Sequence, residues 1–204
     1  MKLLNKRISP ILKSVLLYSL LIGGSGAAVI SSDRFLIKIL DRTISFNDFH
    51  FQYRNLKALN CVYDNSFVVQ YFGKGLIGSL NGFIKNFPKG AEESRKFLHQ
   101  EEKLLQKMRY LFKMLRYAEN QRTEIDPAVI KLVRESVVAN KCDPEILYKE
   151  GLKTNFIGLL ELEIYLKARY GGQLKSQTSF QDIRSSVDLF VESLDKQFSH
   201  EYYW

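Results

Sequence analysis

The sequence predicts a mainly helical domain with one short strand or hairpin near its N-terminus. Two observations lead to this fold class. Apolar residues recur every three or four positions through most of the chain after residue 45, as in amphipathic helices. The stretch Phe35–Phe49 differs: a mostly apolar strand leads into a tight turn at Asp41–Arg42, and Ser45 then begins a helix. A strand needs a hydrogen-bonding partner, which we expect near Thr123–Ile125 or beside the last helix.

Residues 1–28 have the layout of a secretory signal peptide. Basic residues without any acidic ones precede an apolar run at Ser14–Ile22, and small residues fill Gly23–Ala28, as at a signal peptidase site. The run is shorter than the roughly 20 apolar residues that a membrane-spanning helix needs. We therefore expect cleavage and release into the periplasm. The alternative is an uncleaved anchor that holds the protein at the inner membrane, facing the periplasm.

The net charge of +8 does not by itself indicate a nucleic-acid partner. Half of it comes from Lys2, Lys6, Arg7 and Lys13, inside the expected signal peptide. The rest of the chain then has the charge of an ordinary solvated surface. A basic helical protein that binds nucleic acid stays an alternative only if the N-terminal segment is not a signal.

The chain has two cysteines, Cys61 and Cys142. In an exported protein an even number permits one disulfide, which would close a large loop. Two free or buried thiols are equally compatible with the sequence, because the distance between the cysteines is not known at this stage.

Capping residues mark the first helices. Ser45, with Asp48 three residues later, predicts a capping box for a helix that ends near Asn60. The clearest long helix runs from Phe97 to Ala118 with an apolar stripe on one side. Its other faces carry Lys and Arg, which we interpret as a solvated outer surface.

The later helices begin at similar signals. Asp126–Pro127 and Asp143–Pro144 each place a capping Asp before a Pro at the first helical position. The second of these helices is expected to end at Gly151, and a separate helix to span Phe156–Tyr170. A polar linker leads to a last amphipathic helix at Phe180–Phe198.

Residues 67–87 are apolar and rich in glycine. They contain GKGLIG at Gly73–Gly78, a literal GxGxxG. In a dinucleotide site this motif must follow a strand and open a helix of a parallel-sheet unit. No second parallel strand follows, so we interpret the segment as a flexible apolar stretch or as helices broken by glycine.

The sequence offers no pattern for catalysis or for metal binding. His50, His99 and His200 are far apart, and no GxSxG, Walker loop or CxxC occurs. Glu161 and Glu163 lie two positions apart on one helix and point in different directions. The prediction is a binding or scaffold protein, not an enzyme, with no cofactor and no metal.

The order of these elements resembles the N-terminal domain of the SurA and PpiD-type periplasmic chaperones. The resemblance covers roughly residues 33–172 and rests on three segments: IKILDRTISFNDF at Ile37–Phe49, IDPAVI at Ile125–Ile130 after the long helix, and DPEILY at Asp143–Tyr148. In that family, parvulin-type isomerase domains follow, and a final helix returns to pack on the N-terminal domain. The linker in this chain is too short for an isomerase domain.

The resemblance implies a signal peptide at residues 1–28, a chaperone domain at 29–172, and a linker with the returning helix at 173–204, in the same domain. It implies an ATP-independent periplasmic holdase that binds unfolded or partly folded proteins, outer-membrane proteins in transit among them, without isomerase activity. A homodimer is compatible with this reading. No nucleic-acid partner and no membrane span after signal cleavage are expected.

The glycine-rich segment is the candidate surface for unfolded clients, since exposed apolar side chains would bury those of a client. The candidate residues are Phe67, Tyr71, Phe72, Leu76, Ile77, Phe83 and Phe87. Alternatively, these side chains complete the core. The alternative function is a non-catalytic envelope assembly or structural protein, which would bind one folded partner through the terminal helix and the HEYYW tail.

Overall fold

The structure is a computed structural model that describes residues 34–64, 66–73, 75–121, 125–143, 145, 150–171 and 180–203. The expected signal peptide, most of the predicted helix after Asp143 and the predicted linker lie outside these residues. Phe35–Trp204 forms one compact unit.

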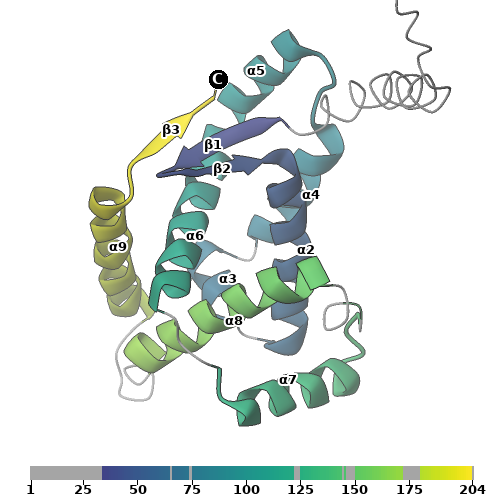
Figure 1. Cartoon of the computed structure of the whole chain (residues 1–204), viewed down its shortest axis with the longest axis vertical. Coiled ribbons are helices and arrows are strands. Elements are labelled where there is room, and N and C mark those ends of the chain that lie inside the picture. The colour runs from purple at the N-terminus through teal and green to yellow at the C-terminus, as the bar shows by residue number, and fades with distance from the viewer. Residues whose placement is uncertain are drawn as a thin grey trace, which may run out of the picture. The chain divides into compact units, whose positions relative to one another are not determined.

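A small antiparallel sheet joins the two ends of this unit (Figure 1). Strand β1 (Phe35–Ile39) pairs on one side with β2 (Arg42–Ser45) and on the other with β3 (His200–Tyr202). The predicted hairpin is confirmed, although its turn lies one residue earlier than expected, at Leu40–Asp41. Strand β3 comes shortly after the terminal helix. Both edges of the apolar β1 are paired only when this C-terminal strand returns to it.

The helix after the hairpin starts as the sequence predicts. In α2 (Phe46–Val62) the Ser45 N–H donates to Asp48 Oδ2 at 2.7 Å, and the Asp48 N–H donates to Ser45 Oγ at 3.3 Å. Both halves of the capping box therefore form.

The glycine-rich segment forms two short helices. They are α3 (Phe67–Phe72) and α4 (Gly75–Asn86), and Gly73 separates them with a φ of 89°, a left-handed conformation that favours glycine. FVVQYF is thus a helix and not the strand that a dinucleotide site requires. The prediction of helices broken by glycine is confirmed.

The long helix predicted at Phe97–Ala118 is divided in two. Helix α5 (Ala91–Gln100) ends with Glu101 as its C-cap, and α6 (Glu102–Gln121) continues the chain. Helix α7 (Pro127–Ala139) begins at the predicted Asp126 cap. The predicted helix end at Gly151 is wrong, because α8 (Glu150–Tyr170) passes through this residue.

The last helix, α9 (Phe180–Gln197), packs on α6, so the predicted return of the C-terminal helix to the core is confirmed. Helix α8 packs across α2, α3 and α6 (Figure 1). Phenylalanines hold the centre: the Phe49 ring lies 5.4 Å from that of Phe83 and 5.7 Å from that of Phe112. Among the described helices, none has the length and hydropathy needed to cross a membrane.

Cys61 and Cys142 form a disulfide, which settles the alternative left open by the sequence. Cys61 lies near the end of α2, and Cys142 follows α7. The bond therefore ties α7 to α2. Asn140 strengthens the connection, because its side-chain amide donates to the Cys61 carbonyl oxygen at 2.9 Å.

Candidate functional site

Most of the residues predicted to bind unfolded clients belong to the core. Phe67, Phe72, Leu76 and Phe83 each expose 6% of their surface or less. The Phe83 ring lies 5.4 Å from those of Phe49, Phe87 and Phe97, so it fills the interior. The expectation of an exposed surface was wrong for these four residues. The glycine break lets α3 and α4 fold back, and their apolar faces are then covered by α2, α6 and α8.

The other three candidates are half-buried and also pack against the core: Tyr71, Ile77 and Phe87. The Tyr71 hydroxyl donates to Asp188 Oδ1 on α9 at 2.6 Å. The Phe87 ring lies 4.7 Å from that of Phe46. These seven residues therefore do not gather into a continuous apolar surface.

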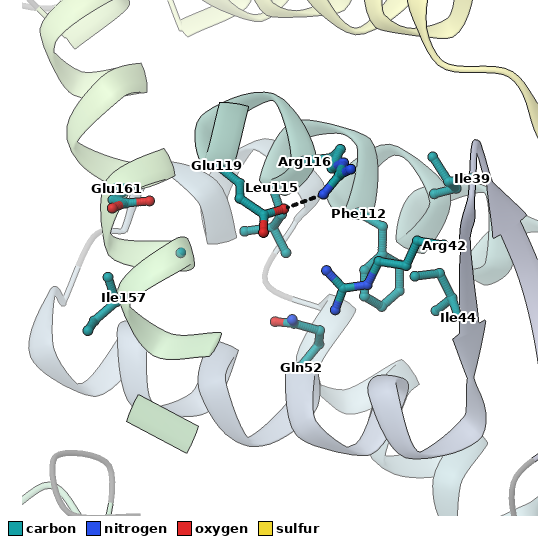
Figure 2. Close-up of a pocket in the computed structure, with 11 residues that line it drawn as sticks. Ile39, Arg42, Ile44, Gln52, Phe112, Leu115, Arg116, Glu119, Ile157 and Glu161 are labelled. Atoms are coloured by element: carbon teal, nitrogen blue, oxygen red, sulfur yellow. Dashed lines mark hydrogen bonds and ion pairs between the residues drawn. The ribbon is translucent and has the colours of Figure 1, made fainter. Parts of the chain in front are cut away.

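A pocket of about 300 Å³ lies elsewhere, between the hairpin, α2, α6 and α8 (Figure 2). Its wall is partly apolar and partly charged. The apolar part consists of Ile39, Ile44, Phe112, Leu115, Ile157 and Gly158. The polar part consists of Arg42, Gln52, Arg116, Glu119 and Glu161. We take this pocket as the candidate functional site because it combines apolar walls with polar groups that converge on one space.

Helical spacing explains how one pocket collects these side chains. Leu115 and Arg116 lie three and four positions after Phe112 and four and three before Glu119 on α6, so these side chains share one face. Residues 157, 158 and 161 do the same on α8. Gly158 lets the two helices enclose the space without a side chain between them: a Cβ there would lie 3.9 Å from Leu115 Cδ2, an ordinary contact.

Gln52 supplies an unpaired acceptor at this site. Its side chain comes from α2, is only 4% exposed, and points into the space between α6 and α8 (Figure 2). Its Oε1 is buried and accepts no hydrogen bond within the described part of the chain. A buried carbonyl oxygen without a donor costs about 1–3 kcal/mol of stability. A ligand that donates an N–H to Gln52 would recover that cost.

The charged groups of the pocket divide into paired and unpaired ones. Arg116 is held by two carboxylates, Glu119 Oε2 at 3.0 Å and Asp41 Oδ1 at 3.7 Å. Glu161 has no cationic partner among the described residues. Burial raises the pKa of the Glu161 carboxyl, and the nearby Glu119 carboxylate raises it further. Glu161 thus lacks a compensating positive charge.

A second polar group, the tail cluster, lies beneath β3 and consists of Arg109, Lys113, Asp195, His200 and Tyr202. Asp195 Oδ2 accepts from Arg109 at 3.3 Å, and Asp195 Oδ1 accepts from Lys113, which is completely buried. Arg109 also donates to the Tyr202 hydroxyl. The cluster fastens the tail strand and α9 to α6.

The surroundings of His200 disfavour the protonated form of its imidazole. Its Nε2 lies 2.8 Å from Arg109 Nη1 and its Nδ1 lies 3.1 Å from Lys113 Nζ, so both ring nitrogens face cations. Burial lowers the pKa of the imidazole, and Arg109 and Lys113 lower it further, while Asp195 opposes them. Burial also lowers the pKa of Lys113, and the hydrogen bond to Asp195 acts in the opposite direction.

Glu163 is a buried carboxylate outside the pocket and the tail cluster, and its role is structural. It accepts from the Ser66 hydroxyl at 2.8 Å and from the N–H groups of Phe67 at 2.8 Å and Val68 at 3.0 Å. It also forms an ion pair with Lys167 at 3.0 Å. The carboxylate thereby caps α3 and fixes it to α8. As predicted, Glu161 and Glu163 point apart.

In the described part of the chain, no group of three metal-ligating side chains occurs.

Sequence reasoning missed both polar sites. Gln52 follows Phe49 by three positions and precedes Leu56 by four, so the helical period places it on the buried stripe of α2. That signal was available. Arg109 and Lys113 were interpreted as part of a solvated face, which was wrong because α9 and β3 cover that side of α6. Part of the HEYYW tail, which was considered for docking a folded partner, is engaged in β3.

Comparisons with models of known protein families, with curated proteins and with solved structures give no match for this chain.

Proposed function

We propose that this protein is an ATP-independent chaperone that holds segments of unfolded polypeptide in its pocket. The observation that carries the proposal is the pocket itself, whose apolar wall is joined by the unpaired Gln52 acceptor and by charged groups. An unfolded chain offers what such a site lacks: apolar side chains to bury and free backbone N–H donors. Binding of this kind needs no chemistry, because holding the unfolded chain is enough to keep it from aggregating.

The disulfide supports a location outside the cytoplasm. Disulfides persist in oxidising compartments such as the periplasm and are rare in the cytosol, and Cys61 and Cys142 are bonded. This agrees with the signal-like sequence of residues 1–28. The location can be tested by cell fractionation, alkylation of free thiols and N-terminal sequencing. We expect an oxidised chain in the periplasmic fraction that begins after residue 27 or 28. A reduced, full-length chain in the cytoplasm would contradict the proposal.

The chaperone activity can be tested with a variant that fills the pocket. Gly158→Leu places an apolar side chain in the space between α6 and α8, at a position where a Cβ makes only an ordinary contact. We expect the wild-type protein to suppress light scattering by an unfolded outer-membrane protein at stoichiometric ratio without ATP. Gly158→Leu should weaken this protection by about tenfold in the concentration required, equivalent to roughly 1.4 kcal/mol of binding.

Gly82→Leu is the matched control. Gly82 is a partly exposed helical glycine on α4, where an added Cβ would meet nothing within 4 Å. It should protect as well as the wild type, and thermal unfolding of both variants would show that the fold is kept. A wild-type protein that gives no protection would refute the holdase function. Equal protection by Gly158→Leu would exclude the pocket as the binding site.

A further inference from the structure

The pocket is electrically asymmetric. Glu161 on α8 and Glu119 on α6 lie toward one end, and Arg42 reaches in from the hairpin side (Figure 2). Arg116 already serves Glu119 and Asp41, which leaves Glu161 without a cation in the described part of the chain. A positive group from a ligand would therefore be attracted to the α8 end and repelled from the Arg42 end.

One buried acceptor of the same pocket receives no hydrogen bond in the described part of the chain. The Gln52 side chain lines the same space as Glu161, and its Oε1 is buried without a partner among the described residues. A lysine ammonium carries three N–H donors and an arginine guanidinium five, while neither accepts a hydrogen bond. An apolar side chain would leave both Gln52 and Glu161 unpaired after water is displaced, which is costly. The two observations are independent and both indicate a cationic donor.

The apolar wall fits the remaining part of such a side chain. Leu115 and Ile157 line the pocket beside Glu119 and Glu161 (Figure 2). Lysine and arginine carry three or four methylene groups that pack along apolar surface while the charged end reaches a polar partner. A long cationic side chain thus matches both parts of the wall.

We propose that the pocket selects lysine or arginine side chains of the bound polypeptide, with Glu161 as the charge partner and Gln52 as a hydrogen-bond acceptor. This inference rests on the proposed function and names the side chain that the site prefers. Arg42 sets the direction in which the side chain enters. The cation also compensates the charge of Glu161, so binding lowers the raised pKa of this carboxyl and strengthens as the pH rises through that pKa.

The test uses the full chain and two fluorescent ten-residue peptides that differ only at a central position, lysine in one and norleucine in the other. Norleucine keeps the methylene groups and removes the charge. We expect the lysine peptide to bind about tenfold more tightly in fluorescence anisotropy. Glu161→Gln should abolish this preference and leave the norleucine peptide unaffected. The affinity of the wild type for lysine should fall on acidification, and that of Glu161→Gln should not.

Glu102→Gln is the control, since Glu102 is an exposed carboxylate on α6 outside the pocket; it should keep the preference. Equal affinity for both peptides would overturn the selectivity, as would a preference that persists in Glu161→Gln. The outcome is separable from that of the proposed function. If the wild type protects the unfolded client and Gly158→Leu does not, while both peptides bind equally, the holdase function stands and only the charge selectivity is refuted.

Discussion

The pocket and the tail cluster both border α6, and both place polar groups in the interior, but they treat these groups differently. In the tail cluster, Lys113 and Arg109 share the Asp195 carboxylate, and only Arg109 Nε lacks a partner. In the pocket, the buried Gln52 Oε1 and the partly buried Glu161 carboxylate have no partner in the described part of the chain. Buried polar groups are normally paired, and the exceptions call for an explanation. This difference supports a stabilising role for the tail cluster and the proposed binding role for the pocket.

The largest effect on stability is expected from removing the carboxylate of the tail cluster. Asp195→Asn leaves the buried Lys113 and Arg109 without a carboxylate, which should lower the free energy of unfolding by about 3 kcal/mol. Burial lowers the pKa of Lys113 and Asp195 opposes this shift, so removal of the carboxylate makes the charged form of Lys113 less favourable. Urea unfolding would measure the change. Asp188→Asn on the same helix is the control: Asp188 accepts a hydrogen bond from Tyr71 at an exposed site, and it should cost less than about 1 kcal/mol. Equal losses for the two variants would contradict the comparison.

In the pocket, we expect a substitution that raises the free energy of unfolding instead of lowering it. Gln52→Met keeps the size of the side chain and removes the unpaired carbonyl oxygen. Because no hydrogen bond is lost, the free energy of unfolding should rise by about 1 kcal/mol. Protection of an unfolded client should fall at the same time, so stability and activity would change in opposite directions. Destabilisation by Gln52→Met would show that the Gln52 amide is needed by the fold, and the distinction between the two regions would then fail.

The smallest effect is a pH dependence in the tail cluster. The pKa of His200 is lowered in the folded protein, so below about pH 6.5 the unfolded chain binds a proton that folded His200 does not. The free energy of unfolding should therefore decrease as the pH falls from about 6.5 toward the folded pKa. Partial exposure of the ring keeps this contribution below about 1 kcal/mol.

His200→Gln should remove this pH dependence, measured as the difference from wild type in urea unfolding between pH 7.5 and 5.5. His50→Gln, at an exposed position on α2, should leave the dependence unchanged. A wild-type protein whose stability difference from His200→Gln is the same at both pH values would show that the two cations do not lower the pKa of His200.

Local signals in the sequence predicted local structure well, and contacts between distant segments less well. The Ser45–Asp48 capping box and the Asp126 cap form as expected, since each depends on a few adjacent residues. The burial of Lys113 could not be predicted from its own helix, because it depends on α9 and β3 packing over α6. The same holds for the disulfide between Cys61 and Cys142.

The candidate site was missed for a related reason. The residues of the pocket come from the hairpin and three helices, and each is unremarkable within its own segment. The aromatic residues of 67–87 attracted attention because they are concentrated in sequence, yet concentration does not indicate exposure. Phe83 shows this, since four phenylalanine rings, those of Phe46, Phe49, Phe87 and Phe97, surround it. In Gln52, by contrast, a polar residue on an apolar stripe was the informative signal.

The pairing of β1 with β3 has a consequence for the order in which the molecule is made. The middle strand of the sheet is the first element of the compact unit, and one of its neighbours is the last. The sheet and the tail cluster can therefore form only after residue 202 has been synthesised. Contacts between such distant parts of a chain form slowly. A nascent chain thus lacks its final fastening throughout translation, and the proposed export would act on a chain that has not yet locked into its final structure.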